Sequence, residues 1–207
     1  MWTLTKEQQQ IITPAQAIEL LKEGNKRFVN NLKINRNLLQ QVNETSQGQY
    51  PFAVVLSCMD SRTPAELIFD QGLGDIFSIR IAGNILNDDI LASIEFACHV
   101  VGVKLIAVIG HTQCGAIKGA CEDVRLGHLT SLLEKIRPVI QHVEMPDSDQ
   151  NAENNEFLYE VSRQNIKHTL QQITEQSEIV RNLLKKKQIA MVGGLYHLET
   201  GSVEFYD

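Results

Sequence analysis

Long apolar runs are absent from this sequence, and so is any segment typical of an exported protein. No apolar stretch reaches the roughly 18 to 20 residues that a membrane-spanning helix needs. The first residues contain neither the charged segment nor the apolar segment of a signal peptide. We therefore expect a protein with no membrane partner that works in the cytoplasm.

Clustered positive charge is scarce as well. The 207 residues include 19 Lys and Arg against 25 Asp and Glu, which gives a formal net charge of −6. The basic residues are scattered, apart from the run Lys185–Lys187. Because nucleic-acid binding needs a basic patch, we do not expect a nucleic-acid partner. With 43% hydrophobic and 21% charged residues, the composition is that of a globular protein and argues against disorder.

Cysteine is also rare, with only Cys58, Cys98, Cys114 and Cys121. Four cysteines at uneven spacing do not form a disulfide scaffold, so we expect them to be free, buried, catalytic or metal-binding. Cys98 and Cys121 lie within apolar helical patterns, and we interpret both as core residues. The chain also lacks Gly-x-Gly-x-x-Gly after any predicted strand, which argues against dinucleotide binding.

Short apolar runs alternate with helical patterns over most of the chain. Runs without polar alternation are typical of strands buried on both faces of a parallel sheet. The predicted strands span residues 52–57, 75–80, 104–110, 188–198 and 203–206. The predicted helices span residues 14–30, 64–69, 88–101, 114–124, 129–143, 156–175 and 177–186. This order predicts an α/β fold with a mostly parallel central sheet of about four strands, a C-terminal antiparallel edge strand and flanking helices.

The chain shows no internal repeat and no segment rich in Gly, Ser or Pro that would separate two domains. We therefore expect one domain over residues 1–207. Within it, residues 1–48 would form an N-terminal helical arm, and residues 49–207 would form the α/β core.

Two predicted strands end at residues that can bind a metal ion. The first runs into Cys58, and the third runs into His111 and Cys114. Ligands of open α/β sheets bind at the carboxyl ends of the strands, so these side chains would converge if the two strands are neighbours. Two thiolates and an imidazole form a zinc-type ligand set, and three protein ligands leave one position open for catalysis. The alternative is that each cysteine is a small apolar core residue.

Asp60 and Arg62 follow Cys58 closely enough to pair on a tight turn. One interpretation is a solvated ion pair of little energetic value. The other places Asp60 beside the metal, either as a ligand or as the acceptor of a hydrogen bond from metal-bound water. Arg62 would then hold the carboxylate away from the metal and keep it ionised. The residues alone leave both interpretations open.

The segments Cys58-Met-Asp60-Ser-Arg62 and His111-Thr-Gln-Cys114-Gly resemble the β-class carbonic anhydrases, and the similarity extends over roughly residues 20 to 125. The resemblance implies Cys58, His111 and Cys114 as zinc ligands, with Asp60 and Arg62 as a catalytic dyad. In closed members of the family the counterpart of Asp60 occupies the fourth metal position, and in open members water or hydroxide does. The resemblance also implies dimers or dimers of dimers.

The same resemblance implies residues that bind the substrate. Gln49 and Phe77 match a Gln and a Phe that line the substrate pocket in one branch of the family, and Phe96 stands where that branch has a Tyr. The implied reaction is the reversible hydration of carbon dioxide to bicarbonate and a proton by zinc-bound hydroxide, which the Asp-Arg dyad orients. Since two thiolates cancel the metal charge, activity should rise from about pH 7 to pH 9.

Two alternatives to this function stay open. Relatives with the same ligand set hydrolyse carbonyl sulfide or carbon disulfide, and that chemistry needs the same nucleophile. The other alternative is a zinc-bound module without catalysis. Asp60 and Arg62 argue against it, because a purely structural zinc ion has no use for such a pair.

Overall fold

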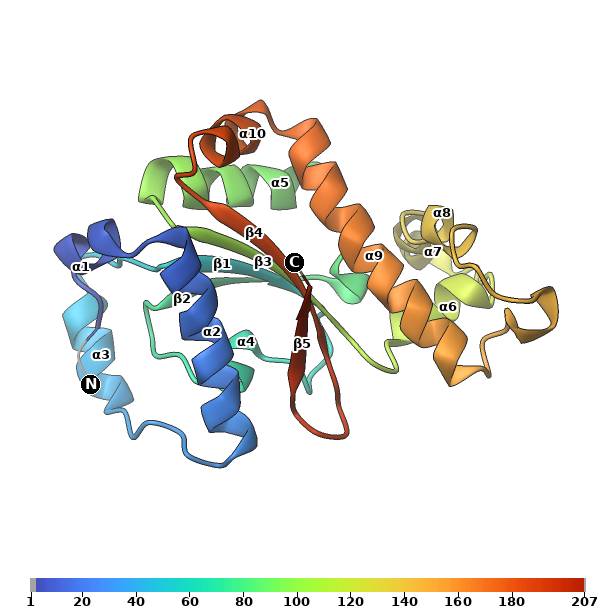
Figure 1. Ribbon diagram of the computed structural model, residues 1–207, viewed down its shortest axis with the longest axis horizontal. Helices are drawn as coiled ribbons and strands as arrows, with labels where there is room; N and C mark the ends of the chain where they lie inside the picture. Colours follow the sequence, from blue (N-terminus) through green and yellow to red (C-terminus); the bar gives the residue numbers. More distant parts are fainter. Residues whose placement is uncertain (1–2, 207) are drawn as a thin grey trace.

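Five strands form one sheet with the order β2-β1-β3-β4-β5 (Figure 1). They are β1 (Ala53–Ser57), β2 (Ile76–Arg80), β3 (Leu105–His111), β4 (Ala190–Tyr196) and β5 (Val203–Tyr206). The first four strands run parallel, and β5 pairs antiparallel with β4 at one edge. The predicted α/β fold with a mostly parallel sheet and an antiparallel C-terminal edge strand is therefore confirmed.

Helices cover both faces of the sheet, which explains why the central strands are apolar throughout (Figure 1). Val54 and Leu56 of β1 pack in the same apolar cluster as residues of α5 (Asp88–Glu95), α9 (Asn155–Gln176) and α10 (Glu178–Lys185). The alternate residues Ala53 and Val55 pack with α2 (Pro14–Val29) and α4 (Ala65–Ile68) on the opposite face. Every residue of β1 and β3 is buried.

The structure is a computed structural model that describes residues 3–206, so residues 1, 2 and 207 of the predicted domain lie outside it. The remaining helical elements are α1 (Lys6–Ile11), α3 (Leu38–Thr45), η1 (Ala82–Asn84), η2 (Phe96–Val101), α6 (Gly115–Cys121), α7 (Gly127–Leu133), α8 (Arg137–Ile140) and η3 (Asp147–Asp149). Among the helices of the described residues, none is both long enough and apolar enough to cross a membrane.

Three helical segments differ in detail from the sequence-based expectation. The segment predicted as one helix over 88–101 is α5 followed by the π-helical turn η2, and it ends at Gly102 with a φ of 87°. The segment 129–143, where Pro138 is expected to kink the helix or end it early, is divided into α7 and α8, and Pro138 lies in the first turn of α8. Helix α1 was not predicted, although Thr5 and Gln8 form a capping box at its start.

The N-terminal arm is tied to the core by polar contacts of α2. The Asn25 side chain donates to the carbonyls of Ile68 (3.0 Å) and Gly201 (2.9 Å) and accepts from the Val203 N–H (2.8 Å). Gly24 lies against the end of α4, where a Cβ atom would come within 2.7 Å of the Phe69 carbonyl carbon. The arm is therefore joined to two segments that are far apart in the sequence.

Candidate metal centre

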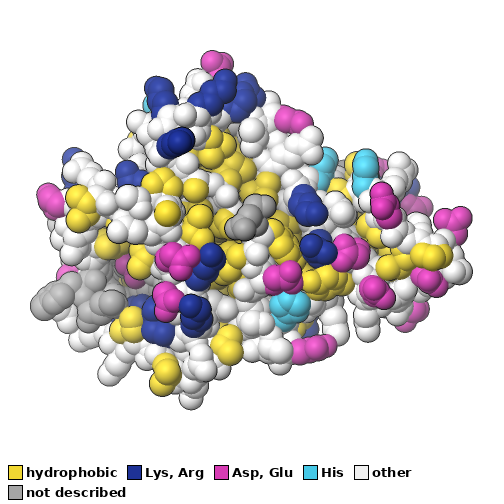
Figure 2. All heavy atoms as spheres, in the orientation of Figure 1, with side chains coloured by type: hydrophobic (Ala, Val, Ile, Leu, Met, Phe, Trp, Pro, Cys, Tyr) yellow, Lys and Arg dark blue, Asp and Glu magenta, His cyan; other side chains and the backbone are white. Residues whose placement is uncertain are grey.

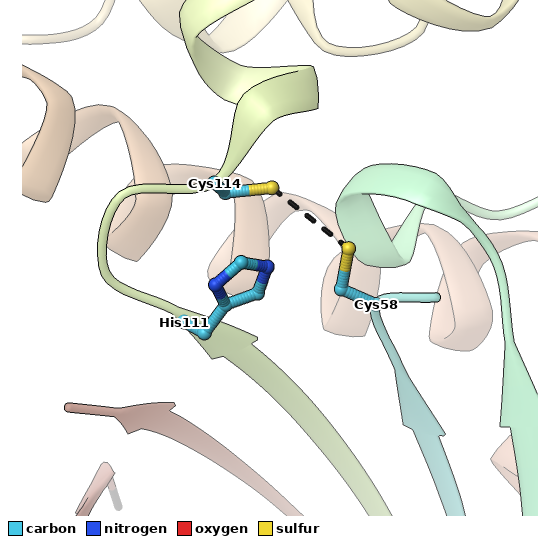
Figure 3. Close-up of side chains that lie close together, drawn as sticks. All are labelled: Cys58, His111 and Cys114. Carbon is cyan, nitrogen blue, oxygen red and sulfur yellow. Dashed lines mark hydrogen bonds between the residues drawn. The ribbon is translucent and has the colours of Figure 1, made fainter. Parts of the chain in front are cut away.

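The carboxyl ends of β1 and β3 lie side by side, because the two strands pair in parallel. Cys58 directly follows β1, and His111 is the last residue of β3. Cys114 is the N-cap residue of α6, three residues after His111. Figure 3 shows the three side chains pointing toward one another from these elements. The prediction that the two strands are neighbours is confirmed.

The three side chains have the spacing of a metal-binding group. Their ligand atoms all lie within 4.8 Å of one another, and the Sγ atoms of Cys58 and Cys114 are 3.9 Å apart. Two thiolates on one tetrahedral zinc ion stand about 3.8 Å apart, given zinc–sulfur bonds of about 2.3 Å. The side chains are also shielded from water, with exposed fractions of 4% for Cys58, 1% for His111 and 4% for Cys114.

His111 has one nitrogen engaged and one nitrogen free. Its Nδ1 lies 2.9 Å from the Thr112 carbonyl oxygen, whereas its buried Nε2 has no hydrogen-bond partner. A buried imidazole nitrogen without a hydrogen-bond partner lowers the stability of the fold, unless a metal ion binds its lone pair. Thr112 is itself held, because its N–H donates to the Tyr196 carbonyl (3.0 Å) and its Oγ1 accepts from the Leu198 N–H (3.1 Å). The residues present therefore fit a zinc ion.

The sulfur atoms of Cys58 and Cys114 lie within hydrogen-bonding distance of each other. A hydrogen bond between Cys114 and Cys58 lowers the pKa of Cys58 to about 4 and raises the pKa of Cys114. The N–H of Gly83 also donates to Cys58, and two N–H groups in the first turn of α6, those of Ala116 and Ile117, donate to Cys114. These donors favour thiolates, which are the form that binds metal.

Asp60 and Arg62 form the ion pair that the sequence suggests. Arg62 donates from Nε to Oδ1 (2.9 Å) and from Nη2 to Oδ2 (2.8 Å) of Asp60. These hydrogen bonds lower the pKa of Asp60 to about 2, so the carboxylate is ionised at neutral pH. Its Oδ2 lies 4.0 Å from Nε2 of His111. The carboxylate therefore borders the cluster, although it is not one of the three clustered ligands.

Two residues outside the predicted site hold the turn after β1 in place. Arg80, at the end of β2, donates to the carbonyls of Cys58 (3.2 Å) and Asp60. The Thr63 hydroxyl donates to the same two carbonyls, at 3.3 and 3.0 Å. Arg80 reaches the turn after β1 only because β2 pairs in parallel with β1. No local sequence pattern therefore predicts its contacts with the Cys58 and Asp60 carbonyls.

The three residues predicted to bind substrate lie in other parts of the fold. Gln49 is exposed and precedes β1, so it lies at the amino end of the sheet, opposite the end that carries Cys58. Phe77 lies half-buried on the edge strand β2. Phe96 opens η2 and is 53% exposed. Their role in substrate binding stays a prediction.

Comparison with known proteins identifies relatives over nearly the whole chain. The family model described as carbonic anhydrase matches residues 53–203. A carbonic anhydrase of Mycolicibacterium smegmatis is 35% identical over 197 residues, covering 92% of each chain. Carbonic anhydrase 2 of Mycobacterium tuberculosis is 34% identical, covering 94% of this chain and 93% of its own.

The fold is also found among solved structures. The β-carbonic anhydrase CcaA superposes with a TM-score of 0.69 and 26% identity, covering 92% of this chain and 95% of its own. The fungal β-carbonic anhydrase CafA of Aspergillus fumigatus has a TM-score of 0.71 at 23% identity, covering 93% of this chain and 90% of its own, which shows the fold alone. Together with the family model and the mycobacterial relatives, these findings show that the chain belongs to the carbonic anhydrase family, in its β class, and is an enzyme of that family.

Proposed function

We propose that this enzyme hydrates carbon dioxide reversibly to bicarbonate and a proton at a zinc ion held by Cys58, His111 and Cys114. The observation that carries the proposal is the convergence of the three ligand atoms around a buried imidazole nitrogen that has no other partner. When bound, zinc would lower the pKa of a water molecule so that hydroxide is available near neutral pH to attack carbon dioxide. The N–H of Gly83 helps to lower the pKa of Cys58, and the N–H groups in the first turn of α6 partly oppose the raised pKa of Cys114.

We assign Asp60 the role of hydrogen-bond acceptor for the reacting water. Arg62 binds both carboxylate oxygens, so the carboxylate is already committed to a partner and is poorly placed to become a fourth ligand. With its pKa lowered to about 2 by these hydrogen bonds, Asp60 acts as an acceptor only and fixes the direction of the water lone pair. This assignment favours an open site over a closed one.

Substrate binding by Gln49, Phe77 and Phe96 needs a second copy of the chain. These residues lie away from the ligand cluster of their own chain, and both Phe96 and the neighbouring Val100 expose more than half of their surface. Exposed large apolar side chains on one element favour an interface. We therefore propose a homodimer or a dimer of dimers, in which a partner brings apolar side chains toward the site. Sedimentation of the purified chain, compared with that of Phe96→Glu, would test this assembly.

The direct test measures zinc content and stopped-flow carbon dioxide hydration at about pH 7 and pH 8.5. We expect one zinc per chain, faster turnover at the higher pH, and loss of both zinc and turnover in Cys58→Ser. Cys121→Ser is the matched control, because Cys121 lies outside the ligand cluster and should leave both quantities unchanged. Full zinc without turnover would contradict the proposal and favour a sulfur analogue of carbon dioxide or a module without catalysis.

The role of Asp60 has its own test. Asp60→Asn should keep one zinc per chain and lower kcat/KM by about a hundredfold, because an amide can turn its N–H₂ toward the water and misdirect it. Zinc content that falls together with activity would instead identify Asp60 as a ligand.

Two broader predictions also remain proposals. The single domain with an N-terminal arm is supported by the Asn25 contacts to Ile68 and Gly201, and limited proteolysis that releases residues 1–48 as a free folded piece would contradict it. The cytoplasmic location is to be tested by cell fractionation.

A further inference from the structure

A cavity lies at the amino end of the sheet, far from the metal centre. It has a volume of about 620 Å³ and is formed by the junction of α1 and α2, the end of η2 and the segment from α10 to β4. Lys104, which precedes β3, lines it, whereas His111 ends the same strand. Seven strand residues separate the two sites by about 20 Å. The cavity therefore plays no direct part in the reaction.

The charge of this cavity is opposite to that of the molecule. Lys104, Lys186, Lys187 and His99 line it, and its lining includes no Asp or Glu, although the chain has a net charge of −6. Figure 2 shows basic side chains gathered at the top of the molecule, where Figure 1 places α10. Within residues 3–206, the lysines that form ion pairs are Lys22, Lys26 and Lys118. The cavity lysines thus keep their charge available for a ligand.

The lysines come from two segments that the fold brings together. The Lys104 carbonyl accepts a hydrogen bond from the Ala190 N–H (2.9 Å), which joins the start of β3 to the start of β4. Lys186 and Lys187 follow α10, where the helix dipole alone would explain a basic residue. A helix dipole does not explain a basic residue at position 104, because Lys104 precedes strand β3. Lysine residues from both segments therefore line the cavity.

Apolar side chains form part of the remaining wall, beside the polar residues Gln10, Thr13, Asn182 and Gln188. Ile12, Leu183 and Ile189 line it together with the lysines, and Ile189 is only 5% exposed. Small-molecule sites commonly have this size, with an apolar lining and a few convergent polar groups. A simple inorganic anion would leave the apolar wall unused, and an uncharged apolar molecule would leave the ammonium groups unpaired.

We propose that this cavity binds a small organic anion. Its phosphate or carboxylate group lies between Lys104 and the pair Lys186 and Lys187, and its apolar part lies against Ile12 and Ile189. The two oxyanion groups share the chemistry that ammonium groups recognise, and a phosphate, with two charges, binds more tightly than a carboxylate. The site is separate from carbon dioxide hydration and does not depend on it.

Methyl NMR of the full zinc-loaded chain, labelled at Ile, Leu and Val, tests the proposal. The probes are phenyl phosphate, benzoate, inorganic phosphate and benzyl alcohol. We expect phenyl phosphate to shift the methyl signals of Ile12, Leu183 and Ile189 saturably, with benzoate weaker and the other two weaker than phenyl phosphate by about tenfold or more. Equal binding of phenyl phosphate and benzyl alcohol, or no shift of these signals by phenyl phosphate, would overturn the proposal.

A charge-matched pair of variants separates this site from general attraction of anions. The double variant Lys104→Gln with Lys187→Gln should weaken phenyl phosphate binding by about tenfold or more, since it removes two charged hydrogen-bond donors. The control Lys6→Gln with Lys135→Gln removes the same charge at exposed positions outside the cavity and should change binding less than about twofold. Equal loss in both variants would refute the site. Because the readout is the cavity methyl signals, an inactive metal centre would not alter this result.

Discussion

Asp70→Asn should strongly destabilise the fold, because the substitution removes a buried carboxylate that pairs with two arginines. The Asp70 side chain is 3% exposed and lies between two arginines. Arg27 donates to Oδ2 (2.5 Å), Arg36 donates to Oδ1 (2.6 Å), and the Ile34 N–H donates to Oδ2 (3.2 Å). The Arg36 side chain is itself only 8% exposed. This carboxylate therefore joins the N-terminal arm to the segment that follows α4.

The magnitude follows from the charge that the substitution leaves behind. Removing one partner of a buried ion pair costs about 3 to 5 kcal/mol, because the other charge stays buried without compensation. Asparagine keeps the shape of the side chain and one acceptor oxygen. We therefore expect the free energy of unfolding to fall by about 3 kcal/mol, near the lower end of this range. For a chain of 207 residues each kcal/mol lowers Tm by about 2 to 4 °C, which gives a fall of about 10 °C.

The assay is urea unfolding of zinc-loaded protein at one fixed concentration, because oligomers gain stability with concentration. Asp123→Asn is the matched control. Asp123 also contacts two arginines, Arg125 and Arg137, but it is 65% exposed and should lose less than about 1 kcal/mol. Equal losses for the two variants would refute the argument from burial.

The pH dependence gives a second check on the same residue. Burial raises the pKa of Asp70, but hydrogen bonds from Arg27, Arg36 and the Ile34 N–H outweigh it, so the pKa is lowered below its usual 3.8. A lowered folded pKa stabilises the fold above the unfolded pKa, and the stabilisation is lost as the pH falls through the folded pKa. The difference in stability between wild type and Asp70→Asn should therefore be full at neutral pH and shrink below about pH 4.

Other substitutions test the packing around the arm and the metal ligands. Gly24→Ala should lower Tm by several degrees, because the new Cβ would overlap the Phe69 backbone. Gly83→Ala should weaken zinc binding and lower Tm, because Gly83 has a φ of 67° and its new Cβ would lie 2.7 Å from an isoleucine carbon. Thr112→Val should weaken zinc binding by about tenfold, measured by competition with a chelator, because it loosens the carbonyl that orients His111, and Thr112→Ser should restore it.

The clustering of Cys58, His111 and Cys114 could be predicted from the sequence because the three residues lie at or shortly after the ends of apolar strands. Cys58 and His111 each follow an uninterrupted buried run, and parallel strands bring their carboxyl ends together at one edge. Cys114 is three residues after His111, at the start of a helix, so local spacing defines it. The spacing of His111 and Cys114 is local, and the approach of Cys58 depends on the pairing of two strands only. Both features can be predicted from a single sequence.

Contacts that join distant segments could not be predicted in this way. Arg80 reaches the turn after β1 only because β2 pairs with β1, and Thr112 is held only because β4 lies beside β3. Helix α1 has a local signal, the capping box of Thr5 and Gln8, but it is only six residues long and has no apolar periodicity to support the signal. The role predicted for Gln49, Phe77 and Phe96 stays a prediction, because none of the three belongs to the cluster of Cys58, His111 and Cys114 in the single chain.

The chain contains two Asp-Arg arrangements that differ in what they stabilise. Asp70 is buried and joins distant segments, whereas Asp60 pairs with Arg62 two residues away, and the Arg62 side chain is 53% exposed. The Asp60 side chain is 19% exposed, but a local pair whose guanidinium is largely in water adds little to stability. We therefore expect Arg62→Gln to leave Tm nearly unchanged while it lowers carbon dioxide hydration sharply, and Asp70→Asn to lower Tm while the folded fraction keeps its turnover. Thermal unfolding and stopped-flow assays on the same two preparations decide this. If Arg62→Gln lowers Tm as much as Asp70→Asn does, the Asp60–Arg62 pair stabilises the fold, and the argument for its role in the reaction is refuted.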